Sequence, residues 1–463
     1  MKQVDFENGS TASNIFQTAL PMMAAQILNL LYSIVDRIYI GRIPGSGTMA
    51  LGGVGLCFPI VIMVIAFTNL YGSGGGALCA IERGKGENEQ AANIMNLSFF
   101  MILVTGLVLM ITGEIFSRPI LYLFGASEDN IAFALVYLRI YLIGTVFTMT
   151  AGGINPFINA QGFSMVGMAT VLTGAVMNII LDPILIFGFH LGIEGAAIAT
   201  VVSQFFSACF AIWFLRGPRA ELKLRLMSIS EFKKHLSTAG EIISLGFASF
   251  VMSFTNSLVS ICCNNTLAHF GGSIYVSVMT MISSIRQIID TPINSLTEGA
   301  SPILSYNYGA KKASRVRDTI RLVTILGISY TFLMWLALRL FPEAFIRIFT
   351  NDDEIITDTV QAMRIYFAAF VFQSLQYSGQ TVFKALGKKK RAIFFSLLRK
   401  VVLVIPLTFM FPYVFHMGTN GVFLAEPVSN VLGGGACFIT MLLTIMPELK
   451  GMEEKSIKGP SPD

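Results

Sequence analysis

Long apolar runs constrain the fold of this chain more than any other feature of its sequence. A transmembrane α-helix needs about 20 consecutive, mainly apolar residues, and the 463 residues contain a series of runs of that order. In chain order they cover about residues 14–40, 50–80, 92–116, 130–158, 165–189, 193–215, 240–269, 273–306, 317–341, 356–386, 393–415 and 419–446. We therefore predict an all-α membrane protein with twelve transmembrane helices.

Composition and short motifs narrow the function classes. Only 13% of the residues are charged, against about 25% in soluble domains, which excludes large soluble domains. The six cysteines form no CxxC pair and the four histidines no HExxH cluster, so we predict neither metal-ligand clusters nor disulfides. No GxxxxGK[ST] loop or selectivity-filter loop is present. The chain is therefore not expected to be an ATPase, another enzyme or a channel, and we expect no cofactor.

Basic residues predict the orientation in the membrane. They gather in the stretch 216–239, in the loop after the eighth run and in the loop after the tenth, and cytoplasmic loops carry such an excess of Lys and Arg. We expect both termini on the cytoplasmic side of the cell membrane, with the first apolar run retained rather than cleaved. A nucleic-acid site would also be basic, but topology explains all of these clusters, so no nucleic-acid partner is expected.

The sequence repeats itself at a nearly fixed offset. Arg139-Ile-Tyr141 recurs 225 residues later as Arg364-Ile-Tyr366. Six runs in each half make the repeats parallel, related by a pseudo-two-fold axis along the membrane normal. The glycine and aromatic matches at an offset of 225 or 226 are Gly74/Gly299, Gly84/Gly309, Phe124/Phe349, Gly162/Gly387, Gly192/Gly418 and Gly195/Gly421. The predicted domains are a six-helix bundle at 1–215, a basic linker at 216–239, and a second bundle at 240–463 that includes a short polar tail from Pro447.

A carboxylate within the fifth apolar run indicates a functional site. A charge at the centre of a membrane helix costs roughly 2.5–3.5 kcal/mol on insertion scales, so Asp182 is unlikely to be tolerated without a role. Asn178 lies one helical turn earlier on the same face, and Pro183 frees a backbone carbonyl. Together these groups are suited to binding and releasing a proton or a small cation.

Asp36, in the first run, has two interpretations. It can be a second carboxylate that faces Asp182 inside the first bundle, or it can pair with Arg37 or lie near the outer interface. The functional interpretation is favoured because adjacent residues point to different faces of a helix.

Glu426 leaves more alternatives open. By the repeat it is the equivalent of Thr200, and it precedes Pro427. It can be a second coupling site, a contact for a cationic substrate, or a structural acid bonded to neighbouring helices.

Further polar residues mark the eighth and tenth runs. Arg286, Asp290, Asn294 and Glu298 recur every four residues, so they share one face. They are either an internal ion pair with its neighbours or the polar wall of a substrate cavity. The tenth run adds neutral groups, and a repeat partner lies in the fourth. The candidate cavity residues are therefore Asn155, Arg286, Asp290, Asn294, Glu298, Gln373, Gln376, Gln380 and Glu426.

These motifs resemble those of the multidrug and toxic compound extrusion (MATE) family, and most closely its bacterial DinF-like branch. The resemblance covers nearly the whole chain. It rests on Pro21 with Val35-Asp36-Arg-Ile-Tyr-Ile-Gly41, on Asn178-Ile-Ile-Leu-Asp182-Pro183, on Gly192-Ile-Glu-Gly195-Ala-Ala-Ile-Ala-Thr200, and on Pro302-Ile-Leu-Ser-Tyr-Asn-Tyr-Gly-Ala-Lys311. It implies two six-helix bundles and export driven by H⁺ or Na⁺. The implied cation site is Asp36, Asn178, Asp182 and Thr200, which would be metal ligands if the ion is Na⁺. Glu298 and Glu426 are not family-wide residues.

The sequence therefore predicts a multidrug efflux antiporter that exports organic, cationic compounds in exchange for H⁺ or Na⁺ by alternating access. Pro21 and Pro183 would ease the bending of their helices. We expect a monomer whose partners are small organic cations or drugs and membrane lipids. The alternatives are an exporter of an endogenous metabolite and a flippase for lipid-linked oligosaccharides. The flippase would need a strongly cationic cavity for pyrophosphate, whereas the intramembrane charges counted above are mainly acidic.

Overall fold

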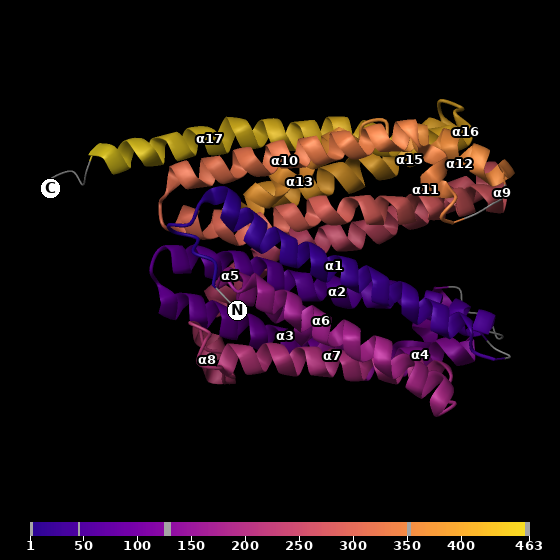
Figure 1. Ribbon diagram of the computed structural model, residues 1–463, viewed down its shortest axis with the longest axis horizontal. Helices are drawn as coiled ribbons and strands as arrows, with labels where there is room; N and C mark the ends of the chain where they lie inside the picture. Colours follow the sequence, from indigo (N-terminus) through magenta and orange to yellow (C-terminus); the bar gives the residue numbers. More distant parts are fainter. Residues whose placement is uncertain (1–2, 45–46, 125–130, 350–352, 459–463) are drawn as a thin grey trace. The chain divides into compact units, whose positions relative to one another are not determined.

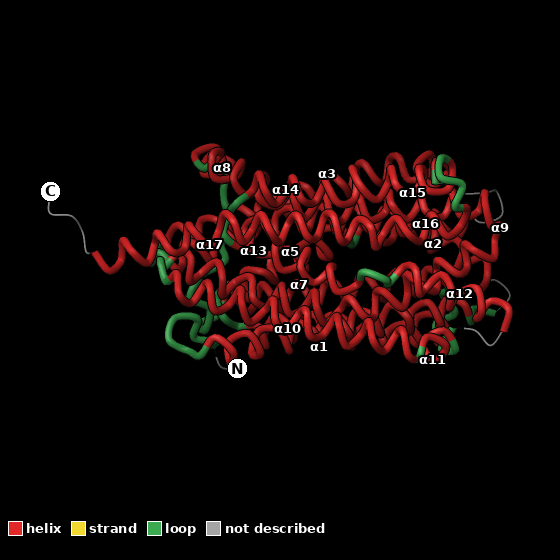
Figure 2. Tube along the Cα trace, turned by 90° about the horizontal axis from the view of Figure 1, so that it is seen from above, coloured by secondary structure: helices red, strands yellow, loops and turns green. Residues whose placement is uncertain are grey.

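A computed structural model describes residues 3–44, 47–124, 131–349 and 353–458 of the chain. Every regular element within these ranges is a helix, and most helices are joined by short loops (Figure 1, Figure 2). The predicted all-α membrane fold is confirmed.

The first half of the chain contains five long helices and one broken pair. Pro183 ends the sixth α-helix of this half, and because proline supplies no N–H the chain continues as a π-helical turn. The elements are α1 (Thr11–Gly41), α2 (Gly47–Gly84), α3 (Asn88–Leu123), α4 (Ile131–Ile143), α5 (Thr145–Ala160), α6 (Ser164–Pro183), η1 (Ile184–Gly188) and α7 (Ile193–Arg216).

The second half begins with a short helix in the basic stretch. This short helix is α8 (Ile229–Lys234). The elements that follow it are α9 (Leu236–Gly309), α10 (Ala313–Leu340), α11 (Pro342–Ile346), α12 (Asp353–Tyr366), α13 (Phe370–Ala385), α14 (Lys389–Leu397), η2 (Leu398–Val404), α15 (Ile405–Tyr413), α16 (Gly418–Ser429), η3 (Asn430–Gly434) and α17 (Gly435–Lys458). Gly272, with φ of 68°, breaks α9 into two helices. The described residues of the predicted polar tail, from Pro447 to Lys458, continue α17.

The number of spans agrees with the sequence-based prediction once the broken helices are considered. Nine helices in the described part of the chain are long and apolar enough to cross a membrane, and two bent pairs raise this number to eleven. The stretch left over is the second part of α9, which carries Arg286, Asp290 and Glu298. This stretch is long enough to cross a membrane, but its charged residues make it less apolar than the other spans.

The internal repeat extends to the backbone. α4 and α5 meet at a bend of 54°, and the equivalent pair α12 and α13 at 49°. Asn155 Nδ2 donates to the Gly167 carbonyl at 2.9 Å, and Gln380 Nε2 donates to the Ala392 carbonyl at 2.8 Å, at corresponding positions. Left-handed φ angles recur in pairs as well, at Gly86/Lys311, Gly162/Gly387, His190/His416 and Gly192/Gly418.

The chain divides into two compact units that exchange short segments. We call Met1–Asp5 with Leu20–Ser253 the N-terminal unit, and Phe6–Ala19 with Phe254–Asp463 the C-terminal unit. The first turns of α1 therefore pack within the C-terminal unit, and the first turns of α9 pack within the N-terminal unit.

Glycines allow this exchange, because they let backbones approach closely in membrane helices. In the N-terminal unit, a Cβ atom at Gly246 would lie 1.7 Å from the Leu70 carbonyl oxygen of α2. In the C-terminal unit, a Cβ atom at Gly299 would lie 2.7 Å from the Cα atom of Ala19. Gly74, the repeat partner of Gly299, also contacts the first turns of α9. Each unit thus uses an equivalent glycine to receive its exchanged helix.

The basic stretch after α7 is bound to the N-terminal unit. The Leu222 N–H donates to Gln161 Oε1 at 2.9 Å, and the Arg225 N–H donates to Asn96 Oδ1 at 2.8 Å. Ser228 and Glu231 then form a reciprocal capping box that begins α8. Polar side chains at the ends of helices therefore hold this stretch in place.

The motif Pro302–Lys311 has a structural role in the C-terminal unit. Asn307 Nδ2 donates to the Phe6 carbonyl at 3.1 Å, and the ring of Tyr306 packs edge-on against that of Phe6. Next to the motif, Lys312 Nζ lies 2.9 Å from Glu7 Oε1. These contacts hold the segment that leads into α1.

We predict that Gly246→Val destabilises the fold, whereas Gly240→Val does not. The valine side chain at 246 must displace the backbone of α2, and overpacking of this kind costs typically about 1–3 kcal/mol. A Cβ atom at Gly240, in the same helix, meets nothing within 4 Å. Thermal unfolding of the purified variants in detergent, followed by size-exclusion chromatography, measures the difference. Equal melting temperatures for the two variants would contradict the close crossing of α2 and α9.

Candidate functional site

Asp36, Asn178 and Asp182 come together in the N-terminal unit, and Thr200 is linked to them through Tyr137. Asn178 and Asp182 are one turn apart on α6, and Asn178 Nδ2 donates to Asp182 Oδ1 at 3.3 Å. Both side chains are buried. The four-residue spacing in the sequence therefore does place the amide and the carboxylate on one face.

Asp36 of α1 reaches the same place. Its carboxyl group and that of Asp182 lie within hydrogen-bonding range of each other. A carboxylate can only accept hydrogen bonds, so two carboxylates this close repel each other unless a proton or a cation lies between them. Arg37 points elsewhere, over the ring of Phe58 at 5.6 Å from its centroid. The geometry therefore favours the facing-carboxylate interpretation of Asp36.

Oxygen atoms without partners characterise this cluster. Asp36 Oδ1, Asn178 Oδ1 and Asp182 Oδ2 are all buried and have no hydrogen-bond partner among the described residues. Buried polar atoms are normally paired, so three acceptors without donors on these residues are an exception that a proton or a small cation would remove. Carboxylate and amide oxygens are ligands that suit a hard cation.

Thr200 of α7 joins the cluster through a tyrosine that the sequence analysis missed. Its hydroxyl donates to the Ala196 carbonyl at 3.1 Å and also contacts the hydroxyl of Tyr137 from α4. Tyr137 is buried, and its hydroxyl lies close enough to Asp36 for an electrostatic interaction. Spacing along the chain could not identify this tyrosine, because its partners Asp36 and Thr200 lie on other helices.

The two prolines lie on the helices that carry the acids. Pro21 is in α1, next to the point where the chain passes from the C-terminal to the N-terminal unit. Pro183 directly follows Asp182 and precedes η1. Each helix therefore has a weakened hydrogen-bond ladder near its acid or its unit boundary.

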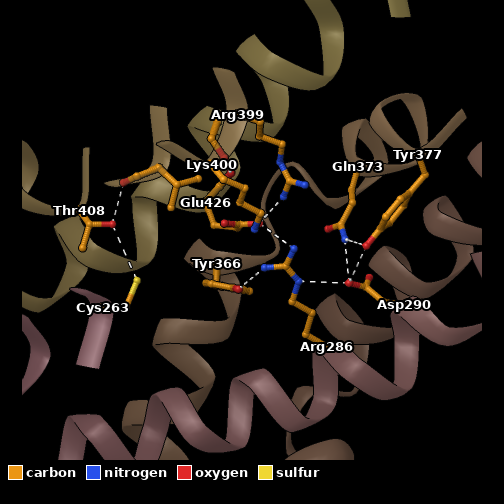
Figure 3. Close-up of polar contacts among 12 residues, drawn as sticks. Cys263, Arg286, Asp290, Tyr366, Gln373, Tyr377, Arg399, Lys400, Thr408 and Glu426 are labelled. Atoms are coloured by element: carbon orange, nitrogen blue, oxygen red, sulfur yellow. Dashed lines mark hydrogen bonds and ion pairs between the residues drawn. The ribbon is translucent and has the colours of Figure 1, made fainter. Parts of the chain in front are cut away.

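A second polar cluster is buried in the C-terminal unit (Figure 3). Glu426 of α16 is at its centre. Its Oε1 atom lies 2.7 Å from Arg286 Nη2 of α9 and 3.6 Å from Lys400 Nζ of η2, and it also accepts from Arg399 Nη2. One carboxylate thus contacts three cations.

Arg286 links Glu426 to a second acid. Its Nε lies 3.2 Å from Asp290 Oδ2, which is the ion pair that was one of the two alternatives drawn from the sequence, and its Nη1 donates to Tyr366 Oη at 2.5 Å. Gln373 Nε2 and Tyr377 Oη donate to the same Asp290 oxygen, at 2.8 and 3.3 Å. We call Arg286, Asp290, Tyr366, Gln373, Tyr377, Arg399, Lys400 and Glu426 the arginine–glutamate cluster.

This arrangement reverses the charge balance inferred from the sequence. Three cations face two carboxylates, so the cluster is cationic rather than acidic. Glu426 is already neutralised and is not free to serve as a counter-charge for a cationic substrate. Arg399 and Lys400 were the missed residues, although two adjacent cations in an apolar run carry the same cost argument as Asp182.

The other candidate cavity residues lie outside this cluster. Asn155 and Gln380 bond to neighbouring helices, as described above, and Gln380 also donates to Ser396 Oγ at 2.6 Å. Gln376 is buried, with an Oε1 that has no partner in the described structure. Asn294 is half-buried and Glu298 is exposed.

Comparisons with known proteins agree with this fold. A family model described as MatE matches residues 21–184 and 248–410. The chain belongs to this family, a class of membrane transporters. The expectation of a transport rather than an enzymatic function is thereby confirmed, as is the resemblance to MATE proteins.

Relatives of similar length are known. The multidrug export protein MepA of Staphylococcus aureus (strain NCTC 8325 / PS 47) is 26% identical over 95% of each chain. MepA of Staphylococcus haemolyticus is 26% identical over 90% of each chain. A crystal structure of MATE in the bent conformation superposes with a TM-score of 0.90 at 22% identity, covering 98% of this chain and 100% of the other.

We predict that Glu426→Gln strongly destabilises the C-terminal unit. The substitution leaves three buried cations with one carboxylate, and breaking a buried ion pair from one side costs about 3–5 kcal/mol. The matched control is Glu298→Gln, because Glu298 is an exposed acid of the same unit. Thermal unfolding in detergent should show a large fall in melting temperature for the first variant only. A Glu426→Gln protein as stable as the control would contradict the central role of this carboxylate.

Proposed function

We propose that this chain is a multidrug efflux antiporter, which exports organic compounds in exchange for H⁺ or Na⁺ by alternating access. The coupling ion binds in the N-terminal unit, at Asp36, Asn178, Asp182 and Thr200. Membership of the family supports transport, and the MepA relatives, named as multidrug export proteins, support drug-like substrates.

The observation that carries the proposal is the carboxyl pair of Asp36 and Asp182. Two acids within hydrogen-bonding range cannot both be charged without strong repulsion. The described residues place no Lys or Arg nitrogen within ion-pair distance of either acid. Arg37 acts on Asp36 only from beyond ion-pair distance, so the pair still needs a positive charge at close range, and a proton or Na⁺ supplies it.

Ion binding at this pair would change the helices that carry it. With the ion bound, α1 and α6 approach each other through Asp36 and Asp182. With the ion released, the two carboxylates repel each other. Pro21 and Pro183 lower the cost of bending these helices, and η1 shows that α6 already departs from α-helical geometry there. A change in helix shape that follows ion occupancy is what couples an ion gradient to a shift between two transporter states.

H⁺ and Na⁺ place different demands on the site. A proton needs only one of the two carboxylates. A sodium ion needs several oxygen ligands, which Asn178 Oδ1 and the Thr200 hydroxyl could complete. The gradient that drives export decides between them.

A flippase for lipid-linked oligosaccharides is the second candidate. The excess positive charge of the arginine–glutamate cluster favours it, because a pyrophosphate group needs cations. Against it, Asp290 and Glu426 already neutralise two of the three positive charges of the cluster. Transport driven by an ion gradient separates the two functions.

We expect Asp182→Asn to abolish gradient-driven export while leaving membrane insertion intact, because asparagine fits the site but cannot bind a proton or neutralise Na⁺. The measurement uses proteoliposomes or inverted vesicles with ethidium as the transported cation. A pH gradient and a Na⁺ gradient are imposed separately, so that the gradient that drives export identifies the ion. The matched control is Glu114→Gln, which removes an acid of the same unit that pairs with Arg139 at 3.8 Å. Export by Asp182→Asn at the parent rate would refute the coupling site, and absence of gradient-driven export in the parent would favour the flippase.

A further inference from the structure

The arginine–glutamate cluster holds more positive charge than it neutralises. Arg286, Arg399 and Lys400 face only Asp290 and Glu426. The exposed fractions of the Arg399, Lys400 and Glu426 side chains are 3%, 7% and 5%. A lone buried charge is costly unless it is paired, and this cluster is short of one negative charge.

Hydrogen bonding shows the same deficit. Lys400 Nζ has no contact in the described structure closer than its 3.6 Å approach to Glu426 Oε1, although an ammonium group has three donors. Arg399 Nε is buried without a partner among the described residues. These two donors lack an acceptor within reach, although Asp290 Oδ1, on the other side of Arg286, is itself buried without a partner among the described residues.

Arg286 is the most accessible cation of the cluster. Its side chain is 16% exposed, and that of its partner Asp290 is 11% exposed. Arg399 and Lys400 contact Glu426 from other directions and can hold it without Arg286 (Figure 3). A guanidinium group can bind a carboxylate through two parallel N–H donors. Arg286 is thus placed to exchange Glu426 for an incoming anion.

We propose that the C-terminal unit contains a binding subsite for a single carboxylate group, carried by a transported organic compound. The carboxylate pairs with Arg286, while Glu426 stays with Arg399 and Lys400. Three cations then face three carboxylates, and the loaded cluster is neutral. This inference rests on the proposed export function and refines its substrate class, from organic cations to compounds that bear a carboxylate.

The single excess positive charge of the cluster favours a carboxylate over a pyrophosphate as its ligand. A carboxylate brings one negative charge and restores neutrality. A pyrophosphate brings more than one and would leave the cluster anionic in a buried setting, at the same kind of cost that the unpaired cation carries.

The test compares two dyes that differ in one group. Tetramethylrhodamine has a free carboxylate, and its methyl ester is a cation of nearly the same size and shape. Binding of each dye to the purified full chain in detergent is measured by fluorescence anisotropy. We expect the parent protein to bind the free acid about tenfold more tightly than the ester, because a charge-assisted hydrogen bond is worth about 1.5–3 kcal/mol.

Variants assign that preference to the cluster. Lys400→Met removes the excess charge without leaving an unpaired acid, so it should fold and lose the preference for the free acid. Lys400→Arg keeps the charge and should keep the preference. Lys390→Met, which removes an exposed lysine of α14, is the matched control and should behave as the parent.

Several outcomes would overturn the subsite. These are equal binding of the two dyes by the parent, binding of neither dye, or an unchanged preference in Lys400→Met. The last result would be expected if Lys400 were uncharged and the cluster already neutral. Stronger displacement of the free acid by inorganic pyrophosphate than by acetate would also contradict a site for a single carboxylate.

The ethidium assay separates this inference from the proposed function. A parent protein that exports ethidium along an ion gradient but shows no preference for the free acid retains the antiport function and lacks the subsite. A parent protein that prefers the free acid but exports nothing in either gradient has the subsite and is not an antiporter.

Discussion

The cost of holding charge inside apolar helix bundles determines what both units of this protein can do. A charge buried in such surroundings must be paired or neutralised. The N-terminal unit places Asp36 and Asp182 together, with no described Lys or Arg nitrogen at ion-pair distance, whereas the C-terminal unit surrounds Glu426 with three cations. The two units share their helical plan through an internal repeat, yet their buried charges have opposite sign. Function in this fold therefore depends on a small number of substituted positions rather than on the helices themselves.

The segments that the two units exchange place the start of one helix of each unit within the other unit. α1 begins in the C-terminal unit, held there by Asn307 and by the close approach of Gly299 to Ala19, and then carries Asp36 into the N-terminal unit. α9 passes between the units in the opposite order, with Gly246 packed on α2. A change in the shape of α1 at Pro21 therefore acts on a helix whose start is fixed in the other unit. The Pro302–Lys311 motif, which contributes no group to either polar cluster, contributes to this anchoring.

Helix positions followed from the sequence because hydrophobic length and glycine or proline breaks are local properties. Most predicted spans agree with the helices to within a few residues, although α3 continues beyond the predicted 116 to Leu123, and α17 continues through polar residues to Lys458. The adjacency of Asn178 and Asp182 also followed from helix geometry alone. Lys400 and Tyr137 could not be placed in this way, because their partners come from helices distant in the chain. Glu426 was identified as a polar residue, but its sequence neighbours gave no sign of the cations that surround it.

The opposite signs of the two clusters also bear on how an ion and a substrate can be exchanged. If both bound to acids, they would compete for the same charges, and the site would have to release one before accepting the other. Here a cation can satisfy Asp36 and Asp182 but not the excess charge beside Lys400, and an anion has the reverse preference. The acid pair and the arginine–glutamate cluster lie in different units, so the ligand that neutralises each of them binds within one unit. In the proposed antiport mechanism, coupling between them is carried by the shape of the helices that cross from one unit to the other, α1 and α9, rather than by direct displacement of one ligand by another.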